Sequence, residues 1–114
     1  MDDCIFCRII ARKIPAKIVF EDERVVAIED LHAQAPTHLL VIPRQHLPSL
    51  KEAVADDAAL LGHLHVVAGQ LARERGLEGN GYRTVINNGV GAGQSVFHLH
   101  VHLLGGRAFH WPPG

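Results

Sequence analysis

The stretch His98-Leu99-His100-Val101-His102-Leu103 alternates imidazole and aliphatic side chains without interruption. Successive side chains of a β-strand point to opposite faces, so the pattern predicts three imidazoles on one face and an apolar face toward the core. Same-face neighbours on a straight strand lie about 6.7 Å apart, and the outer two about 13 Å apart. Because zinc holds nitrogen ligands at about 2.0–2.1 Å, the three histidines are not expected to share one ion. We therefore expect them to have different tasks.

The segment immediately upstream, residues 88–95, is rich in glycine and ends in Ser95. Glycines let a backbone approach an anion closely, and a serine hydroxyl adds a donor. Imidazole is nucleophilic at neutral pH, and protonated neighbours stabilise phosphoryl oxygens. Taken alone, the glycines also fit a hairpin loop, and the histidines a metal site or a solvated sheet face. Together they favour phosphoryl chemistry.

The remaining periodicities complete an antiparallel α+β domain. A short helix capped by Asp3 is expected to reach about Ala11, and a long one to run from Asp56 or Asp57 to Gly76. Strands are expected at residues 18–20 and 25–28, which form a hairpin, at 37–42, ended by Pro43, and at 82–87 and 97–104. The sequence therefore predicts a five-stranded antiparallel sheet with one long and one short helix.

Composition excludes several classes of protein. The chain has 114 residues, which fits one domain. Eleven Lys and Arg against 12 Asp and Glu leave no basic surplus for a nucleic-acid partner. The longest apolar runs are far shorter than the roughly 20 residues that span a bilayer, so no membrane partner is expected. Met1-Asp2-Asp3 is acidic where a secretory signal is basic, which predicts a cytoplasmic protein.

Cys4 and Cys7 form the only cysteine pair. Two cysteines do not make a disulfide scaffold. A redox pair, half of a zinc site completed by two of the nine histidines, and two small apolar positions on a short helix are all compatible with the spacing.

Residues 93–104, Gly-Gln-Ser-Val-Phe-His-Leu-His-Val-His-Leu-Leu, resemble the signature of the histidine triad (HIT) superfamily. The tail from Gly105 to Gly114 is similar to that of its Hint branch, as are residues 14–17, 34–38 and 41–43. The resemblance covers essentially the whole chain. It implies one HIT domain over residues 1–114 and a purine nucleoside phosphoramidase, which cleaves the P–N bond of adenosine 5′-phosphoramidates to AMP without a catalytic metal.

The resemblance also implies roles for individual side chains. His100 is the nucleophile and carries a transient nucleotidyl group, His102 and Ser95 contact the phosphoryl group, and His38 assists proton transfer. In an apolar strand, His38 is also compatible with a satisfied core position. Asp30 is expected to bind the ribose hydroxyls, or else to cap a turn. The other nucleotide-binding positions are an apolar base slot (Phe6, Ile9, Phe20, Ile28 and Leu31), Asn87, and the loop residues Gly93 and Gln94.

Relatives with an N-terminal Cys-x-x-Cys bind a structural zinc ion, and the matching positions here are Cys4, Cys7, His46 and His98. The resemblance further implies a homodimer with one continuous ten-stranded sheet. In that dimer Trp111 reaches the partner's active site, although it could instead anchor its own tail.

Three rival functions remain. A dinucleoside polyphosphate hydrolase of the Fhit kind uses the same nucleophile but lacks the Trp-Pro-Pro-Gly tail. A nucleotide-binding scaffold would hydrolyse only incidentally. A zinc hydrolase would use the histidine strand as its metal ligands.

Overall fold

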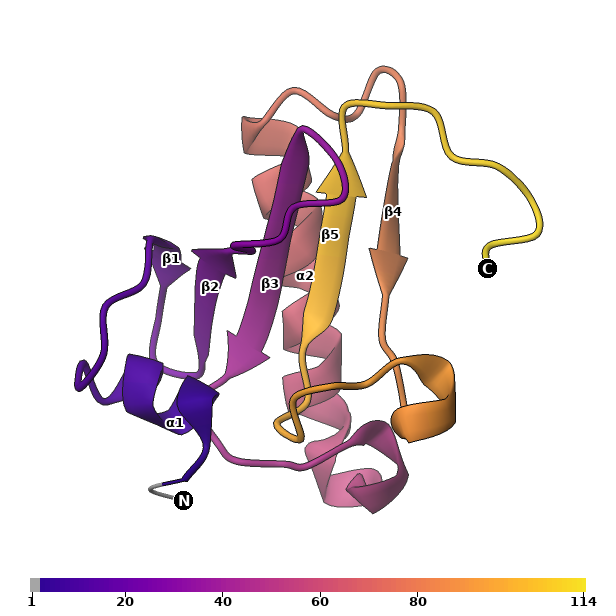
Figure 1. Cartoon of the computed structure of the whole chain (residues 1–114). Coiled ribbons are helices and arrows are strands. Elements are labelled where there is room, and N and C mark those ends of the chain that lie inside the picture. The colour runs from indigo at the N-terminus through magenta and orange to yellow at the C-terminus, as the bar shows by residue number, and fades with distance from the viewer. Residues whose placement is uncertain (1–2) are drawn as a thin grey trace.

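The computed structural model describes residues 3–114; Met1 and Asp2, which belong to the acidic N-terminal segment, lie outside the described residues. Five antiparallel strands form one sheet in the order β1-β2-β3-β5-β4 (Figure 1). The strands are β1 (Ile18–Glu21), β2 (Val25–Glu29), β3 (Thr37–Pro43), β4 (Tyr82–Val85) and β5 (Val101–Gly105); the helices are α1 (Ile5–Ile10) and α2 (Ala58–Glu74). The predicted α+β architecture is confirmed.

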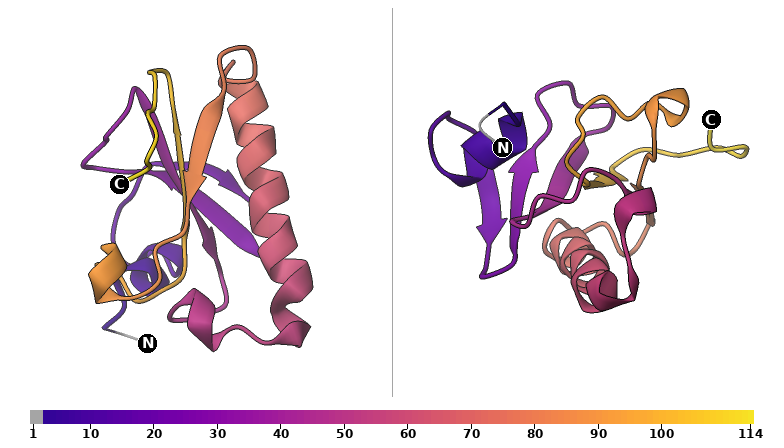
Figure 2. Two further views of the ribbon diagram at one scale, coloured as in Figure 1. Left: turned by 90° about the vertical axis from the view of Figure 1, so that its right-hand side faces the viewer. Right: turned by 90° about the horizontal axis from the view of Figure 1, so that it is seen from below.

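The long helix α2 covers one face of the sheet, and α1 lies on the other (Figure 2). Leu64, Val67 and Leu71 recur at helical spacing and are buried against the sheet. The sheet side of this core is built from alternate residues of β3 and β5, including Leu39 and Leu103. Their neighbours along each strand therefore point to the opposite face.

That opposite face combines a second apolar cluster with histidines. Phe6 and Ile9 of α1 pack against residues of β2 and β3, including Ile28. Directly paired residues of antiparallel strands share a face. Leu40 pairs with His102, so the His102 side chain lies on the face that α1 partly covers.

The ends of the helices differ from expectation. Cys4, and not Asp3, occupies the N-cap of α1, and its sulfur accepts the Cys7 amide hydrogen. Because α1 begins at Ile5, the N-cap position falls on Cys4 and not on Asp3. The long helix begins at Ala58, since residues 55–57 form a tighter 3₁₀ turn. Gly76 follows its C-cap at a φ of 71°, as the expected stop signal requires.

Two strands are shorter than predicted. β4 ends at Val85 instead of residue 87, and β5 begins at Val101 instead of Phe97. Residues 94–100 form hydrogen bonds to groups outside the strand ladder. The Leu99 amide donates to the carbonyl of Leu47, at 2.7 Å, and not to a neighbouring strand. The alternating pattern therefore spans a boundary, with His98 and His100 before the strand and His102 within it.

The helices of residues 3–114 include none that is both long and apolar enough to cross a membrane.

The junction after β5 generates a stability prediction. Gly106 has a φ of 92°, and a Cβ there would lie 2.9 Å from the Pro36 Cβ. Gly106→Ala should therefore lower the free energy of unfolding by about 1–3 kcal/mol. Gly62, in α2, has no neighbour within 4 Å of its Cβ position. Gly62→Ala should raise the free energy of unfolding by about 1 kcal/mol. Urea titration of both variants measures these changes. Equal stabilities of the two variants would contradict the prediction.

Candidate active site and metal centre

His100 is buried, and its two ring nitrogens are in different environments. Nδ1–H donates to the carbonyl of His98 at 2.8 Å. The proton of the neutral ring is therefore on Nδ1, and Nε2 keeps its lone pair. The ring packs between the edge of Phe6, with centroids 5.1 Å apart, and the ring of His102, at 4.9 Å.

Burial keeps these imidazoles neutral. It lowers the pKa of His100. It also lowers the pKa of His102 to about 4, together with the neighbouring rings of His100 and His38. Burial lowers the pKa of His38 as well, against the opposing effect of the Asp30 carboxylate. Since only a neutral imidazole has a free lone pair, the surroundings favour the nucleophilic form of His100 at neutral pH.

His38 and His102 are joined by a hydrogen bond, and the Asp30 carboxylate lies beside them. The backbone N–H of Gln34 donates to His38 Nδ1 at 3.0 Å, so the proton of neutral His38 is on Nε2. His38 Nε2 lies 2.9 Å from His102 Nδ1 and 3.3 Å from Asp30 Oδ2. The Nε2–H of His38 therefore donates to His102, whose own proton is then on its Nε2. The other carboxylate oxygen of Asp30 accepts from the amide of His32.

Two groups of metal-ligating side chains occur among residues 3–114, and their chemistry differs. In the group Asp30, His38 and His102, a metal on His38 Nε2 would move that ring's proton to Nδ1, against the Gln34 N–H. This group is thus arranged for proton transfer. The second group contains Cys4, Cys7, His46 and His98, whose donor atoms all lie within 4.8 Å of one another.

The second group fits a zinc ion. His98 Nδ1 lies 3.1 Å from His46 Nδ1, 3.4 Å from Cys4 Sγ and 3.6 Å from Cys7 Sγ, and Cys7 Sγ lies 3.3 Å from His46 Nδ1. Tetrahedral zinc with two nitrogen and two sulfur ligands implies donor separations of roughly 3.3–3.8 Å. The four positions expected to bind zinc are therefore brought together.

The surroundings of His98 prepare it as a ligand. Its Nε2–H donates to the carbonyl of Pro43 at 2.7 Å, which leaves the Nδ1 lone pair facing the two sulfurs. Burial lowers the pKa of His98 to about 4, so the ring is neutral. Without a cation, burial and the Cys4 thiol raise the pKa of the Cys7 thiol, and a bound cation would favour its thiolate. Such an ion would cross-link α1, the segment after β3 and the segment before β5.

The loop before the histidines is braced by Gln94. Its side-chain amide donates to the carbonyls of Pro48 and Val96, and its Oε1 accepts from the Gly89 N–H. Both amide hydrogens are therefore used within the protein, and a ligand contact of this side chain would displace one of them. Gly93 has a φ of 94°, and Ser95 is exposed.

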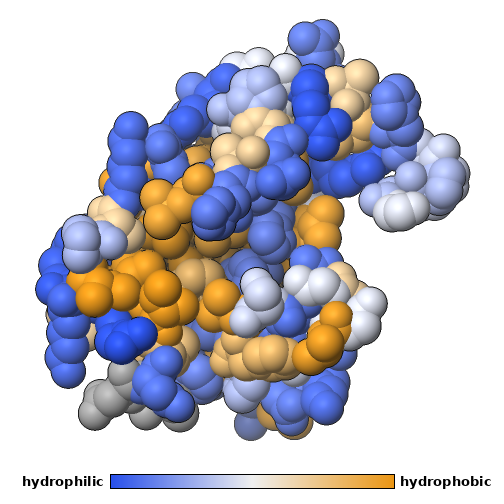
Figure 3. Space-filling model, in the orientation of Figure 1, coloured by the Kyte–Doolittle hydropathy of each residue, from blue (hydrophilic) through white to orange (hydrophobic). Residues whose placement is uncertain are grey.

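The expected base-slot residues do not form one group. Phe6, Ile9 and Ile28 belong to the cluster beside α1. Phe20 packs instead against the core beneath α2, because it points to the other face of β1, and its place in the slot is a wrong prediction. Leu31 is 94% exposed in the turn after β2. Asn87 is half-buried just beyond β4. Figure 3 shows apolar side chains beside polar ones on this face of the molecule.

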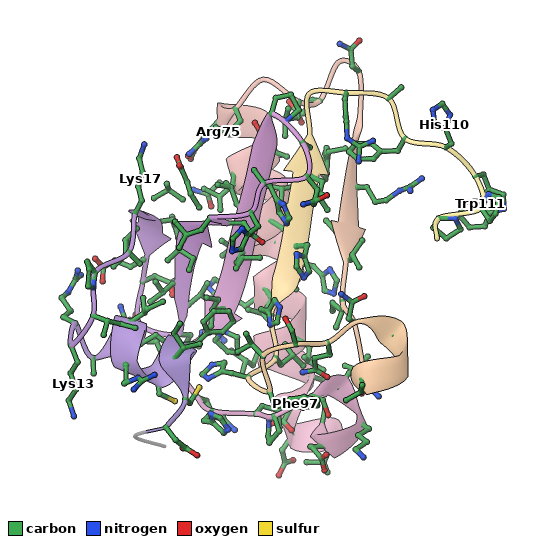
Figure 4. All side chains as sticks on the ribbon, in the orientation of Figure 1. Lys13, Lys17, Arg75, Phe97, His110 and Trp111 are labelled. Atoms are coloured by element: carbon green, nitrogen blue, oxygen red, sulfur yellow. The ribbon has the colours of Figure 1, made fainter. Side chains whose placement is uncertain are left out.

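Two arginines contact the C-terminal tail where it leaves the sheet. Arg107 lies 4.3 Å from the centroid of the Phe109 ring and Arg83 lies 5.2 Å from it. Arg83 also donates to the carbonyl of His110. Beyond this stack Trp111 is 82% exposed and points away from the sheet (Figure 4), so it does not anchor its own tail.

Several contributors to the site have no signal in the sequence. The carbonyls of His98 and Pro43 are backbone groups that any residue type supplies, and the Gln34 N–H is one that any residue except proline supplies. The contact of Phe6 with two imidazoles is a consequence of where α1 docks. Only a structure locates such partners.

Comparison with known proteins identifies relatives along nearly the whole chain. Residues 3–109 match the sequence model of a family described as "Scavenger mRNA decapping enzyme C-term binding". A HIT-like protein of Synechocystis sp. is 53% identical over 113 residues, which cover 99% of this chain and 98% of that protein.

Solved structures agree with the sequence matches. A HIT family hydrolase from Legionella pneumophila superposes with a TM-score of 0.97 at 47% identity, over 98% of this chain and 100% of that one. A histidine triad protein from Clostridium difficile superposes with a TM-score of 0.93 at 41% identity, over 96% of each chain.

The geometry of the second group predicts one bound zinc ion per chain. Two of its ligands, Cys4 and His46, line a cavity of about 330 Å³, so added metal and chelators have access. His46→Ala removes one of four ligands. If zinc affinity falls about 100-fold, linkage predicts a loss of about 2.7 kcal/mol and a melting temperature roughly 10 °C lower at a fixed metal concentration.

The matched control is His65→Ala, which removes an exposed histidine of α2. Zinc content by atomic spectroscopy and thermal melting should be unchanged in this variant. Retention of a full equivalent of tightly bound zinc by His46→Ala would contradict the proposed ligand set.

Proposed function

The chain belongs to the histidine triad (HIT) family, and on that premise we propose that it is a nucleotide-binding hydrolase that cleaves the P–N bond of purine nucleoside 5′-phosphoramidates. The observation that carries the proposal is the single free lone pair of His100, on Nε2, beside the His102–His38 pair. A nucleophile and an adjacent proton carrier are the two groups that this reaction requires. The chain from residue 1 to 114 then works as one HIT domain.

In the first step, Nε2 of His100 attacks phosphorus and a new N–P bond forms. The bond from phosphorus to the leaving amine breaks, and the amine departs with the electron pair. The bound phosphoryl anion favours an extra proton on the His102–His38 pair, which the Asp30 carboxylate also stabilises. The pair passes that proton to the amine. His100 now carries the nucleotidyl group.

In the second step, water attacks phosphorus from the side that the amine has left. The bond from phosphorus to His100 breaks, AMP departs, and the proton of the water returns to the His102–His38 pair. The sum is phosphoramidate plus water to AMP plus amine. Neither step requires a metal ion.

Other residues bind the nucleotide in this proposal. Ser95 and the backbone near Gly93 bind phosphoryl oxygens, and Asn87 lies at the ribose and phosphate. Asp30 has a second role as acceptor for a ribose hydroxyl. The exposed Leu31 contacts the base, and Ile9, only 6% exposed, supports the base slot from within the apolar cluster beside α1. The zinc ion is structural, because its four ligands do not include the groups that carry the reaction.

We expect the active form to be a homodimer. β4 is an edge strand that pairs only with β5 among the described residues, so its outer edge is available to a second copy. Val66, on the exposed side of α2, is 67% exposed, which is high for a valine on a helix. Such a dimer has ten strands in one sheet and brings Trp111 toward the partner's leaving-group site.

The nucleophile is tested by His100→Ala. Turnover of adenosine 5′-phosphoramidate should fall at least about 10³-fold, because loss of the nucleophile removes the covalent route. Mass spectrometry of wild type quenched in denaturant at alkaline pH, where the N–P bond of a nucleotidyl-histidine survives, should find one added AMP on His100. His65→Ala should retain wild-type turnover. Equal rates for His100→Ala and wild type would exclude His100 as the nucleophile.

The same assay separates the alternatives. Faster turnover of a diadenosine polyphosphate than of the phosphoramidate would indicate a dinucleoside polyphosphate hydrolase of the Fhit kind. Tight AMP binding with negligible turnover of every phosphoramidate would indicate a scaffold. A fall of activity to the uncatalysed rate on chelation, with the fold intact, would indicate a zinc hydrolase.

Oligomeric state gives an independent test. Sedimentation equilibrium of the wild type should give twice the chain mass of 12.5 kDa. Thr84→Pro, on the edge strand, removes a backbone donor and should shift the equilibrium toward monomer. The matched control is Thr84→Ala, which keeps the backbone donor and should leave the mass at two chains. A wild-type mass of one chain at micromolar concentration would contradict the dimer.

A further inference from the structure

We propose that the metal centre positions the nucleophile as well as stabilising the fold. His98 is the positioning residue: its side chain belongs to the metal centre, and its backbone carbonyl holds the His100 ring. Phe6 of α1 completes the link by packing against both rings. The inference rests on the proposed function for the role of His100 as nucleophile.

The first reason is that His100 lies outside the sheet. The pairs of β5 with β3 and β4 run from Val101 to Gly105. Residues 98–100 are thus not held by the ladder that fixes the orientation of His102. The nearest backbone anchor is the bond from the Leu99 amide to Leu47, at 2.7 Å, and Leu47 directly follows the metal-centre residue His46. The metal centre therefore lies beside both ends of this anchor.

The second reason is the fixation of His98 itself. Its Nε2–H donates to the carbonyl of Pro43 at the end of β3, and its Nδ1 lies within the Cys and His group. Because both ring nitrogens are held, the His98 side chain is fixed, and this limits changes in the backbone dihedral angles that set the direction of its carbonyl. The carbonyl of that residue accepts the Nδ1–H of His100, so the direction of the carbonyl determines where Nε2 of His100 points.

The third reason is the position of Phe6 between the two cysteines. Its ring meets His98 edge-on at 5.8 Å and His100 at 5.1 Å. α1 has only six residues, too few to form a stable helix by itself. Its place on the sheet depends on tertiary contacts, and the group at Cys4 and Cys7 supplies several of them. Loss of the metal should therefore loosen Phe6 and His98 together.

The effect should be on catalysis more than on nucleotide affinity. Residues that orient a reacting group through one intermediate contact typically contribute 10–100-fold. Asp30, which is expected to bind ribose, follows the end of β2, is held by the His32 amide and belongs to the other group of ligating side chains. Metal removal should thus lower kcat and leave KM nearly unchanged.

The experiment compares zinc-loaded, metal-free and zinc-reloaded wild type at a temperature at which circular dichroism shows all three folded. We expect kcat for adenosine 5′-phosphoramidate to fall 10–100-fold without metal, KM to stay within threefold, and reloading to restore kcat. Hydrogen exchange of the Leu99 amide should accelerate at least tenfold, while that of Val41 in β3 should not change. Nitrogen NMR of the histidine rings should show less of the Nδ1–H form of His100.

Either of two results would overturn the inference. One is an unchanged kcat and unchanged His100 tautomer in folded, metal-free protein. The other is equal acceleration of exchange at Leu99 and Val41, which indicates general loosening. If wild type turns over no phosphoramidate even with zinc bound, the proposed function fails. The exchange and tautomer measurements still decide the positioning role in that case.

Phe6→Leu tests the link with the metal retained, and remains informative if the metal-free chain unfolds. We expect full zinc content, kcat about tenfold lower, and a smaller Nδ1–H population for His100. The matched control is Ile5→Leu, a conservative change at the neighbouring exposed position of the same helix, which should leave all three unchanged. A Phe6→Leu variant equal to Ile5→Leu in kcat and tautomer would exclude a role for Phe6.

Discussion

The hydrogen bond from His100 Nδ1 to the carbonyl of His98 is the contact on which the site depends. A neutral imidazole has one proton, and this carbonyl determines that the outer nitrogen is free to attack. The carbonyl is useful only if its residue is fixed, and His98 is fixed by β3 and by the Cys and His group. Both β3 and the Cys and His group therefore act on the same peptide group, the one whose carbonyl orients His100.

Two clusters that each contain two histidines have different chemistry, both because only one of them contains thiols and because the backbone groups that contact the histidine rings differ. At His98 a backbone carbonyl accepts the proton of Nε2 and leaves a lone pair directed at two sulfurs. At His38 a backbone amide donates to Nδ1, so the opposite nitrogen presents a proton to His102. A donor at one ring and an acceptor at the other separate metal binding from proton transfer.

Much of this arrangement could be predicted from periodicity and spacing. The hairpin, the buried strand around His38 and the long helix follow from apolar patterns, and the resemblance pointed to the four positions of the metal group. The start of β5 could not be predicted, because the alternation continues through residues 98–100 while Leu99 bonds to Leu47. Phe20 was misplaced because its strand is short and its face is not marked by alternation. Backbone partners such as the Gln34 N–H have no residue signature at all.

The order of strands in the sheet has a consequence for how the chain folds during synthesis. β5 lies between β3 and β4 although it follows both in the chain. β4 has no strand to pair with until β5 has been synthesised. The metal group is likewise incomplete until then, because His98 follows Cys4 by 94 residues. The hairpin and β3 can assemble on the ribosome, but the remainder must close in one late event. A nascent chain that lacks β5 therefore has neither a complete core nor a reactive histidine.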